Sequence, residues 1–275
     1  MAITGTCPTG TPDASVQPDA PGAGSGGTTG SGGKTGSGGA TGSGGVVGTG
    51  GKSGSGGVVG TGGKSGSGGT TSTGGCGALI DDMESGTGKI CSGSGRVGLW
   101  FTYVDSSTTS AIAPATTGQA LPEYLSTPRG TSQYAMHVQG YYSTYAGMAV
   151  WLNKSSFSGS TGTYNASSYT GIKFYARGSG GGGTFDVKGQ MASTEPEKYG
   201  GTCTATTCNG NYYSYPSTLS STSWTQISVP FTSLKSGTVT PFSPTSTWSF
   251  EFYYYSETSL AGASFDLWID DLTFY

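Results

Sequence analysis

Residues 265–275 read FDLWIDDLTFY, and residues 79–84, far earlier in the chain, read LIDDME. Each run is mainly apolar around an Asp-Asp pair, and neither has the i, i+3, i+4 spacing of an amphipathic helix. We therefore expect both runs to be β-strands. A folded part that begins and ends with strands is closed most simply by pairing them within one antiparallel sandwich.

This pairing would bring together the carboxylates of Asp82, Glu84, Asp270 and Asp271. Their repulsion has to be relieved, and a hard cation with oxygen ligands is the usual means. The sequence therefore predicts a structural Ca²⁺ ion where the two ends meet, with these four residues as candidate ligands, Glu84 and Asp270 foremost. The alternative is a solvated strand end.

The composition restricts the class of partner. Charged residues make up 10% of the 275 residues, and the net charge is −3. No basic stripe exists to bind nucleic acid or an anionic membrane. The polar surface must come from Ser, Thr, Asn, Gly and 17 Tyr residues, which favours neutral, hydroxyl-rich partners such as sugars.

The five cysteines are Cys7, Cys76, Cys91, Cys203 and Cys208. They include no Cys-x-x-Cys pair and the chain has a single His, which argues against zinc. We predict the disulfides Cys76–Cys91 and Cys203–Cys208, with Cys7 unpaired, and hence an oxidising compartment. We expect a secreted protein whose signal has been removed, although an internal start is the alternative.

The first third of the chain differs from the rest. Residues 1–23 lack apolar periodicity and are predicted to be a disordered tail. Residues 24–71 repeat the hexapeptide Gly-Ser/Thr-Gly-Gly-x-x eight times. We interpret residues 24–75 as a flexible linker. A fibre or oligomer built from a polyglycine-like helix is the alternative, since Gly recurs at every third position without Pro.

Residues 76–275 show the pattern of an all-β domain. Short runs rich in Tyr, Phe, Val, Ile and Trp are separated by Gly, Ser, Thr and Pro clusters, which predicts a β-sandwich jelly roll of the galactose-binding-like type. The ten predicted strands are 78–84, 97–104, 133–140, 146–152, 170–177, 184–191, 211–219, 223–231, 247–256 and 264–274. Residues 105–132 are predicted to be a long loop, either a functional rim or mobile.

Alternation along residues 248–254 predicts which side chains share a face. Positions 248, 250, 252 and 254 should lie on one face, with Glu251 and Tyr253 on the other. His137 is expected to be a structural residue on a strand face.

The order of four motifs resembles that of jelly-roll carbohydrate-binding modules of family 11 and their family 30 relatives. The motifs are LIDDME at 79–84, YTGIKFYAR at 169–177, SWTQISVPFTSL at 223–234, and the run 265–274. The resemblance implies a non-catalytic domain, usually attached to glucanases, that binds a single β-glucan chain in a tyrosine-lined cleft and carries structural calcium.

The resemblance also implies binding residues. Tyr103 follows Trp100 as a binding Tyr does in family 11, and Tyr145 precedes a Gly at the start of a strand. The third binding Tyr would be Tyr254, or its neighbour Tyr253. The family's acid before the strand at 211–219 is replaced by the amides Asn209 and Asn211. Its Arg and Asp after the Pro-Phe-Ser-Ser motif are represented only by Lys235.

Two other functions compete with carbohydrate binding. A β-sandwich glycoside hydrolase or polysaccharide lyase would need two facing carboxylates. The candidates are Glu195, Glu197, Glu251 and Glu257, and no signature pairs any two of them. A glycine-repeat extracellular fibre or surface protein would need an ordered repeat. We expect the partner to be a polysaccharide, with β-glucan as the first candidate. We expect the protein to bind it as a monomer.

Overall fold

The computed structural model describes residues 76–275 except 116–117, 205–207, 209–210 and 236–240. The predicted tail (1–23), the linker (24–75), Cys7 and Asn209 lie outside the described residues. The described helices are the 3₁₀ turns η1 (Glu197–Tyr199), η2 (Phe231–Ser233) and η3 (Pro244–Ser246). None of them has the length and apolarity that crossing a membrane requires.

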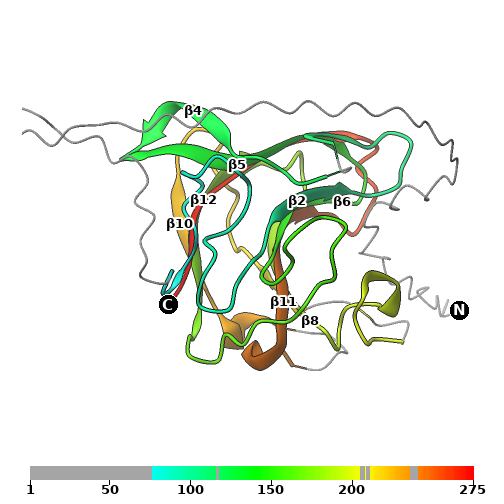
Figure 1. The fold of residues 1–275 in the computed structure, drawn as a ribbon. Helices are drawn as coiled ribbons and strands as arrows, with labels where there is room; N and C mark the ends of the chain where they lie inside the picture. Colours follow the sequence, from blue (N-terminus) through cyan, green and yellow to red (C-terminus); the bar gives the residue numbers. More distant parts are fainter. Residues whose placement is uncertain (1–75, 116–117, 205–207, 209–210, 236–240) are drawn as a thin grey trace, which may run out of the picture. The chain divides into compact units, whose positions relative to one another are not determined.

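The described residues form twelve strands in two antiparallel sheets, as predicted for a β-sandwich; Figure 1 shows their arrangement. The seven-stranded sheet holds β10 (Thr225–Pro230), β7 (Gly171–Ser179), β12 (Ala263–Phe274), β5 (Ser132–Tyr142) and β3 (Ala111–Ala113) in that order, with β1 (Leu79–Asp81) on β12 and β4 (Glu123–Arg129) on β5. The five-stranded sheet holds β2 (Trp100–Val104), β6 (Tyr145–Trp151), β11 (Thr247–Tyr255), β8 (Thr184–Met191) and β9 (Asn211–Ser214) in that order.

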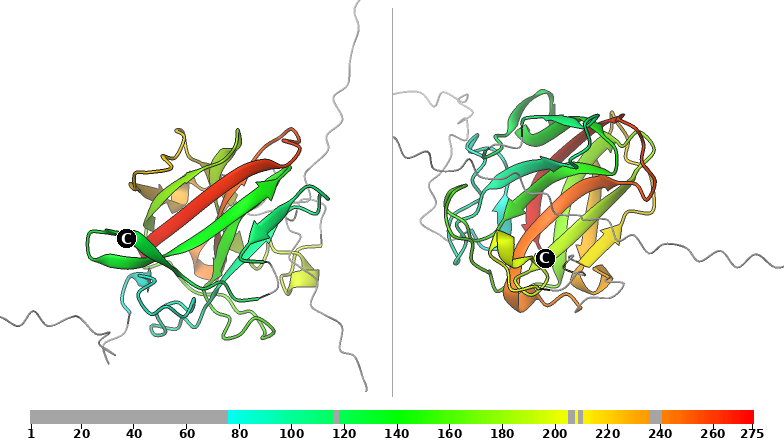
Figure 2. Two further views of the ribbon diagram at one scale, coloured as in Figure 1. Left: turned by 90° about the horizontal axis from the view of Figure 1, so that it is seen from above. Right: turned by 90° about the vertical axis from the view of Figure 1, so that its right-hand side faces the viewer.

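The predicted pairing of the first and last strands is confirmed. β1 runs antiparallel to β12, with Leu79 opposite Thr273 and Asp81 opposite Leu272. β12 is the central strand of its sheet, between β7 and β5 (Figure 2). Its register shifts between Asp270 and Thr273, and Asp271 has φ +49°, so a β-bulge lies at the Asp-Asp pair.

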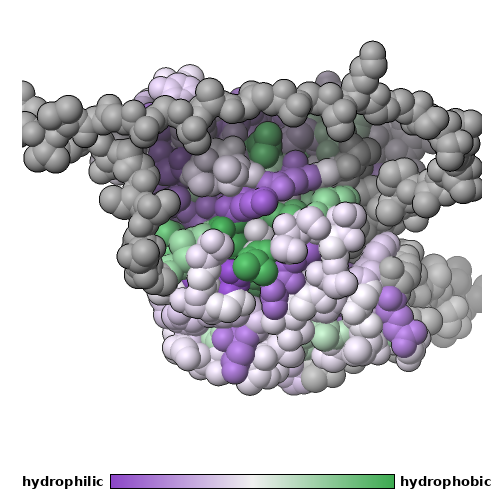
Figure 3. Space-filling view, viewed as in Figure 1, coloured by the Kyte–Doolittle hydropathy of each residue, from purple (hydrophilic) through white to green (hydrophobic). Residues whose placement is uncertain are grey.

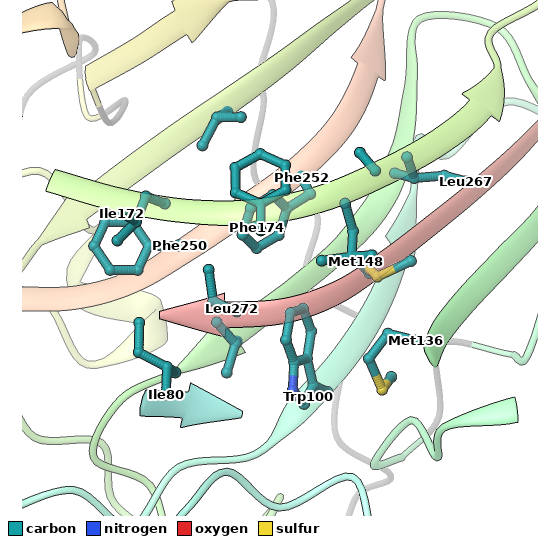
Figure 4. Packing of buried hydrophobic residues seen from close by; sticks show 14 of the residues in the cluster. Ile80, Trp100, Met136, Met148, Ile172, Phe174, Phe250, Phe252, Leu267 and Leu272 are labelled. Carbon is teal, nitrogen blue, oxygen red and sulfur yellow. The ribbon is translucent and has the colours of Figure 1, made fainter. Parts of the chain in front are cut away.

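The core fills the space between the sheets with alternate residues of the long strands. Figure 4 shows members from both sheets, among them Phe174, Leu267, Met148 and Phe252. Trp100 packs in the same cluster, and its indole Nε1 donates a 2.8 Å hydrogen bond to Asp81 Oδ2. Because Trp100 belongs to β2, this hydrogen bond connects β1 to the five-stranded sheet, in addition to the pairing of β1 with β12.

The predicted loop at 105–132 is wrong in part, because it contains strands β3 and β4. Both strands are at the edge of the seven-stranded sheet, and most of their residues are exposed. An exposed edge strand does not need apolar alternation, and β4 even contains Pro128. These strands consequently lack the pattern by which the others were recognised.

The predicted disulfides Cys76–Cys91 and Cys203–Cys208 are both present. The first joins segments 15 residues apart and fixes the chain immediately before β1. Disulfides are typical of proteins from oxidising compartments.

The outer face of the seven-stranded sheet carries a row of stacked rings and cations. His137 lies flat on Trp268, with ring centroids 3.7 Å apart and planes at 10°. The Arg177 guanidinium carbon lies 4.6 Å from the Trp268 ring and 4.9 Å from the Trp224 ring. His137 is thus a structural residue on a strand face, as expected.

His137 is held by two carboxylates. Its Nδ1 lies 2.7 Å from Glu123 Oε2 and its Nε2 lies 3.2 Å from Asp266 Oδ2. Burial lowers the pKa of His137, but the hydrogen bonds and charges of Asp266 and Glu123 outweigh it, so that the pKa is raised above 6.5. Protonated His137 also has the better interaction with the Trp268 ring.

The raised pKa predicts a pH-dependent contribution to stability. A histidine whose pKa is higher in the folded state stabilises the fold below its unfolded pKa, and this contribution is lost as pH rises through the folded pKa. We expect His137→Gln to lower the free energy of unfolding more at pH 5.5 than at pH 8.5, as measured by urea denaturation. Equal losses at both pH values would contradict this interpretation.

Candidate functional site

The outer face of the five-stranded sheet gathers aromatic side chains. Residues of β2, β6 and β11 alternate between the core and this face, so each strand supplies every second side chain. The aromatic face, as we call it, comprises a buried cluster that is separate from the core: Leu99, Phe101, Tyr103, Tyr145, Ala149, Trp151, Trp248 and Tyr253.

Three tyrosines come together on the aromatic face. The ring centroid of Tyr103 lies 6.2 Å from that of Tyr145 and 6.4 Å from that of Tyr253. Gly147 stands between Tyr103 and Tyr253 in the register of the three strands. A Cβ atom there would lie 2.2 Å from Phe252 O and 2.5 Å from Tyr253 Cβ, so only glycine permits this approach.

A second aromatic pair extends the face. Phe101 and Trp151 are stacked with centroids 3.8 Å apart, and Lys154 Nζ lies 3.9 Å from the Trp151 ring. These residues were not predicted from the sequence to bind sugar. The signal was present in β6, where Tyr145, Ala149 and Trp151 follow the alternation that also places Tyr145.

Glu251 is the polar centre of the aromatic face. Its Oε2 accepts hydrogen bonds from Tyr103 Oη at 3.0 Å and from Lys188 Nζ at 2.9 Å. Burial raises the pKa of Tyr103 well above its usual range, and the charge of Glu251 adds to the effect. Tyr103 therefore remains a neutral hydroxyl donor at any physiological pH.

Asp105 positions Tyr145. Its Oδ2 accepts hydrogen bonds from the backbone N–H groups of Ser143, Thr144 and Tyr145 at 2.9, 2.6 and 3.1 Å. Partial burial raises the pKa of Asp105, but the hydrogen bonds from Ser110 and from the N–H groups of Thr144, Ser107 and Ser143 outweigh it and lower the pKa below 3.8. The carboxylate thus fixes the β5–β6 turn from which Tyr145 emerges.

The other predicted binding residues are distributed differently. Tyr254 is 1% exposed and belongs to the core between the sheets, so its neighbour Tyr253 takes the position on the aromatic face. Asn211 is fully buried and alternates with Tyr212, whose side chain is exposed. Lys235 exchanges two backbone hydrogen bonds with Tyr212 and extends the sheet beyond β9.

The prediction of which β11 side chains share a face is correct except at the start of the strand. Phe250, Phe252 and Tyr254 point into the core, whereas Trp248 belongs to the aromatic face. The reason is a register shift between Thr247 and Ser249, which makes Trp248 the extra residue of a β-bulge.

Three tyrosines of this face are buried and a fourth is exposed. Tyr103, Tyr145 and Tyr253 are 5%, 4% and 7% exposed, whereas Tyr212 on the edge strand β9 is 45% exposed. Weakly polar residues predominate over the side of the domain seen in Figure 3, and strongly hydrophobic ones are scattered. Of these four tyrosines, Tyr212 has by far the largest exposed fraction.

A sequence profile decides the family. The profile described as carbohydrate binding domain 30 matches residues 100–275, well over half of the chain. The chain belongs to this family. The carbohydrate-binding domain is accordingly a non-catalytic module. No curated protein matches the sequence.

Solved structures provide distant likenesses. A family 11 carbohydrate-binding module from Clostridium thermocellum, in complex with a β-1,3-1,4-mixed-linked tetrasaccharide, is 18% identical with a TM-score of 0.43, covering 72% of this chain and 94% of that one. The family 30 module of the cellulosomal cellulase Cel9D-Cel44B of Clostridium thermocellum is 16% identical with a TM-score of 0.37, covering 64% and 97%.

The predicted calcium ligands of the carbohydrate-binding domain meet an arginine. Arg129 Nε lies 2.9 Å from Asp270 Oδ2, and its Nη2 binds Asp271 Oδ2. The bulge in β12 allows one guanidinium to reach both carboxylates. Ser132 Oγ donates a further 2.8 Å hydrogen bond to Asp270. Arg129 thus supplies the positive charge that the sequence analysis assigned to a metal ion.

The remaining two carboxylates bind hydrogen-bond donors. Glu84 Oε1 accepts from the backbone N–H groups of Gln133 and Tyr134 at 2.8 and 3.0 Å, and Asp82 Oδ1 accepts from the N–H of Glu84 at 3.2 Å. In the described part of the chain no group of three or more His, Cys, Asp or Glu side chains is placed to hold a metal ion. As placed, these four side chains do not form a calcium site. Calcium binding stays a prediction from the sequence.

Arg129 is predicted to be essential for stability. Asp270 is fully buried, so Arg129→Met leaves a buried carboxylate without its ion-pair partner. Loss of one partner of a buried pair costs about 3 kcal/mol or more, which urea denaturation would measure. Lys173→Met, which removes a positive charge from the same sheet, is the control.

EDTA tests calcium binding in the same assay. If a calcium ion is bound, EDTA lowers the midpoint of urea unfolding; if Arg129 alone neutralises the carboxylates, EDTA leaves the midpoint unchanged.

Proposed function

We propose that the carbohydrate-binding domain binds one chain of a neutral β-linked glucan along its aromatic face. The observation that carries the proposal is the grouping of Tyr103, Tyr145 and Tyr253, with centroid distances of 6.2 and 6.4 Å, around the polar centre at Glu251. A pyranose presents both an apolar C–H face and a rim of hydroxyls. This grouping offers a partner to each.

The rings and the polar groups have different tasks. An aromatic ring buries the C–H face of a sugar, while neighbouring hydroxyl, ammonium and carboxylate groups satisfy its rim. Tyr212, which is 45% exposed, leaves room to bury roughly 70 Å² of a sugar face, and roughly 25 cal/mol per Å² gives about 2 kcal/mol for that ring before ordering costs.

The electrostatics favour an uncharged ligand. Glu251 and Lys188 are already paired with each other at 2.9 Å. A neutral sugar can hydrogen-bond to such a pair without breaking it. Affinity should accordingly depend little on salt, because the ligand carries no charge that salt could screen.

The setting that we propose is extracellular. The two disulfides fit an oxidising compartment.

Alanine substitutions on the aromatic face test the proposal. Tyr212→Ala should weaken binding of a soluble mixed-linkage β-glucan about tenfold, because it removes the exposed stacking ring. Tyr103→Ala and Tyr253→Ala should weaken it about as much, because Tyr103 holds Glu251 by a hydrogen bond and the Tyr253 ring lies 5.6 Å from Lys188 Nζ. Isothermal titration calorimetry gives the affinities, and thermal unfolding identifies variants that remain folded.

Tyr124→Ala is the matched control. Tyr124 is 57% exposed, but it lies on β4 of the other sheet. Its variant should bind like the unmodified protein. The proposed site is wrong when folded variants at 103, 253 and 212 all retain full affinity, or when Tyr124→Ala alone loses it.

A further inference from the structure

One carboxylate oxygen on the aromatic face lacks a hydrogen-bond partner. Asp186 of β8 stands between Tyr253 of β11 and Ser214 of β9 in the register of the sheet. Its neighbours Phe185 and Val187 point into the core, so Asp186 points to the side of Tyr253. The residue is 3% exposed, and its Oδ1 has no hydrogen-bond partner.

The neighbouring charged and polar groups do not provide a hydrogen bond to Asp186 Oδ1. The hydroxyl of Ser214 hydrogen-bonds to the Asp186 carboxylate, and Lys188 attracts it from along the strand. However, Lys188 Nζ is bound to Glu251 at 2.9 Å. The phenols of Tyr253 and Tyr255 on β11 and of Tyr212 on β9 share this face. Burial raises the pKa of Tyr253 and Tyr255, so these two phenols do not ionise at physiological pH.

An unpartnered buried acceptor requires an explanation. A buried oxygen that loses its hydrogen bond to water is destabilised, and such oxygens are rare in native proteins. Burial raises the pKa of Asp186 to about 6, and Ser214 and Lys188 only partly oppose this effect. The carboxylate is nevertheless ionised at neutral pH, when it is the strongest available acceptor for a hydroxyl donor.

We propose that Asp186 determines specificity, with Oδ1 accepting a hydrogen bond from a hydroxyl of the sugar residue that contacts Tyr253. This inference rests on the proposed function, because the sugar has to lie on the aromatic face. It narrows the ligand class to a glucan with free hydroxyls. An O-methylated sugar cannot donate at this position, and a uronic acid is repelled by the carboxylate.

The proposal predicts a pH dependence of binding. The ionised carboxylate accepts the sugar hydroxyl, and protonation below about pH 6 removes the charge that strengthens the bond. With a tenfold contribution from this bond, affinity for cellohexaose should be about fivefold weaker at pH 5 than at pH 8.

Asp186→Asn is the critical variant. Asparagine keeps the size of the side chain but does not ionise near pH 6. We expect cellohexaose to bind this variant about tenfold more weakly at pH 8, with equal affinities at pH 5 and pH 8. Discrimination against O-methylated cellohexaose should also decrease. Glu123→Gln, which neutralises an acid on the other sheet, should leave affinity and its pH dependence unchanged.

The outcomes separate the two proposals. If cellohexaose binds the protein and Tyr103→Ala weakens binding, but Asp186→Asn has the unmodified affinity and pH profile, the inference about Asp186 is overturned and the proposed function stands. Such a result would mean that water, rather than a sugar, satisfies Oδ1. If Tyr103→Ala and Asp186→Asn both bind like the unmodified protein, the site itself is overturned.

Discussion

The two-residue period of strand β11 is the constraint on which the site depends. β11 is the central strand of the five-stranded sheet, and most of its side chains are buried on both faces. Phe250, Phe252 and Tyr254 fill the core, and Glu251 and Tyr253 form part of the aromatic face. A shift of one residue would exchange these sets, placing a carboxylate in the core. Core packing therefore fixes the position of the binding groups.

The closure of the sandwich depends on a second constraint, which is electrostatic. Pairing β1 with β12 brings acidic side chains to one end of the seven-stranded sheet. Arg129, at the end of β4, neutralises Asp270 and Asp271 and stacks 3.9 Å from the Tyr175 ring. The edge hairpin β4–β5 is thus anchored to the central strand by charge as well as by its backbone hydrogen bonds.

The sequence predicted the strands with strong alternation and the closure of the two ends, because buried strands must repeat apolar residues at fixed spacing. It did not predict β3 and β4, whose exposed edges require no such pattern. It placed Tyr103 and Tyr145 on one face, but it favoured Tyr254 over Tyr253 as the third binding tyrosine, which is wrong because Tyr254 belongs to the core. Both are tyrosines, and only the register separates them. Asp186 and Lys188 were missed because their role follows from neighbours on other strands. The counter-charge of Asp270 was assigned to a metal, since nothing in the sequence links residue 129 to residue 270.

The indole N–H resonances test most directly whether sugar binds the aromatic face. Trp151 and Trp248 lie on that face, Trp224 and Trp268 lie on the outer side of the seven-stranded sheet, and Trp100 lies in the core. In a titration of ¹⁵N-labelled protein with cellohexaose, the account predicts shifts at Trp151 and Trp248 while Trp224 and Trp268 stay in place. Shifts confined to Trp224 and Trp268 would contradict it.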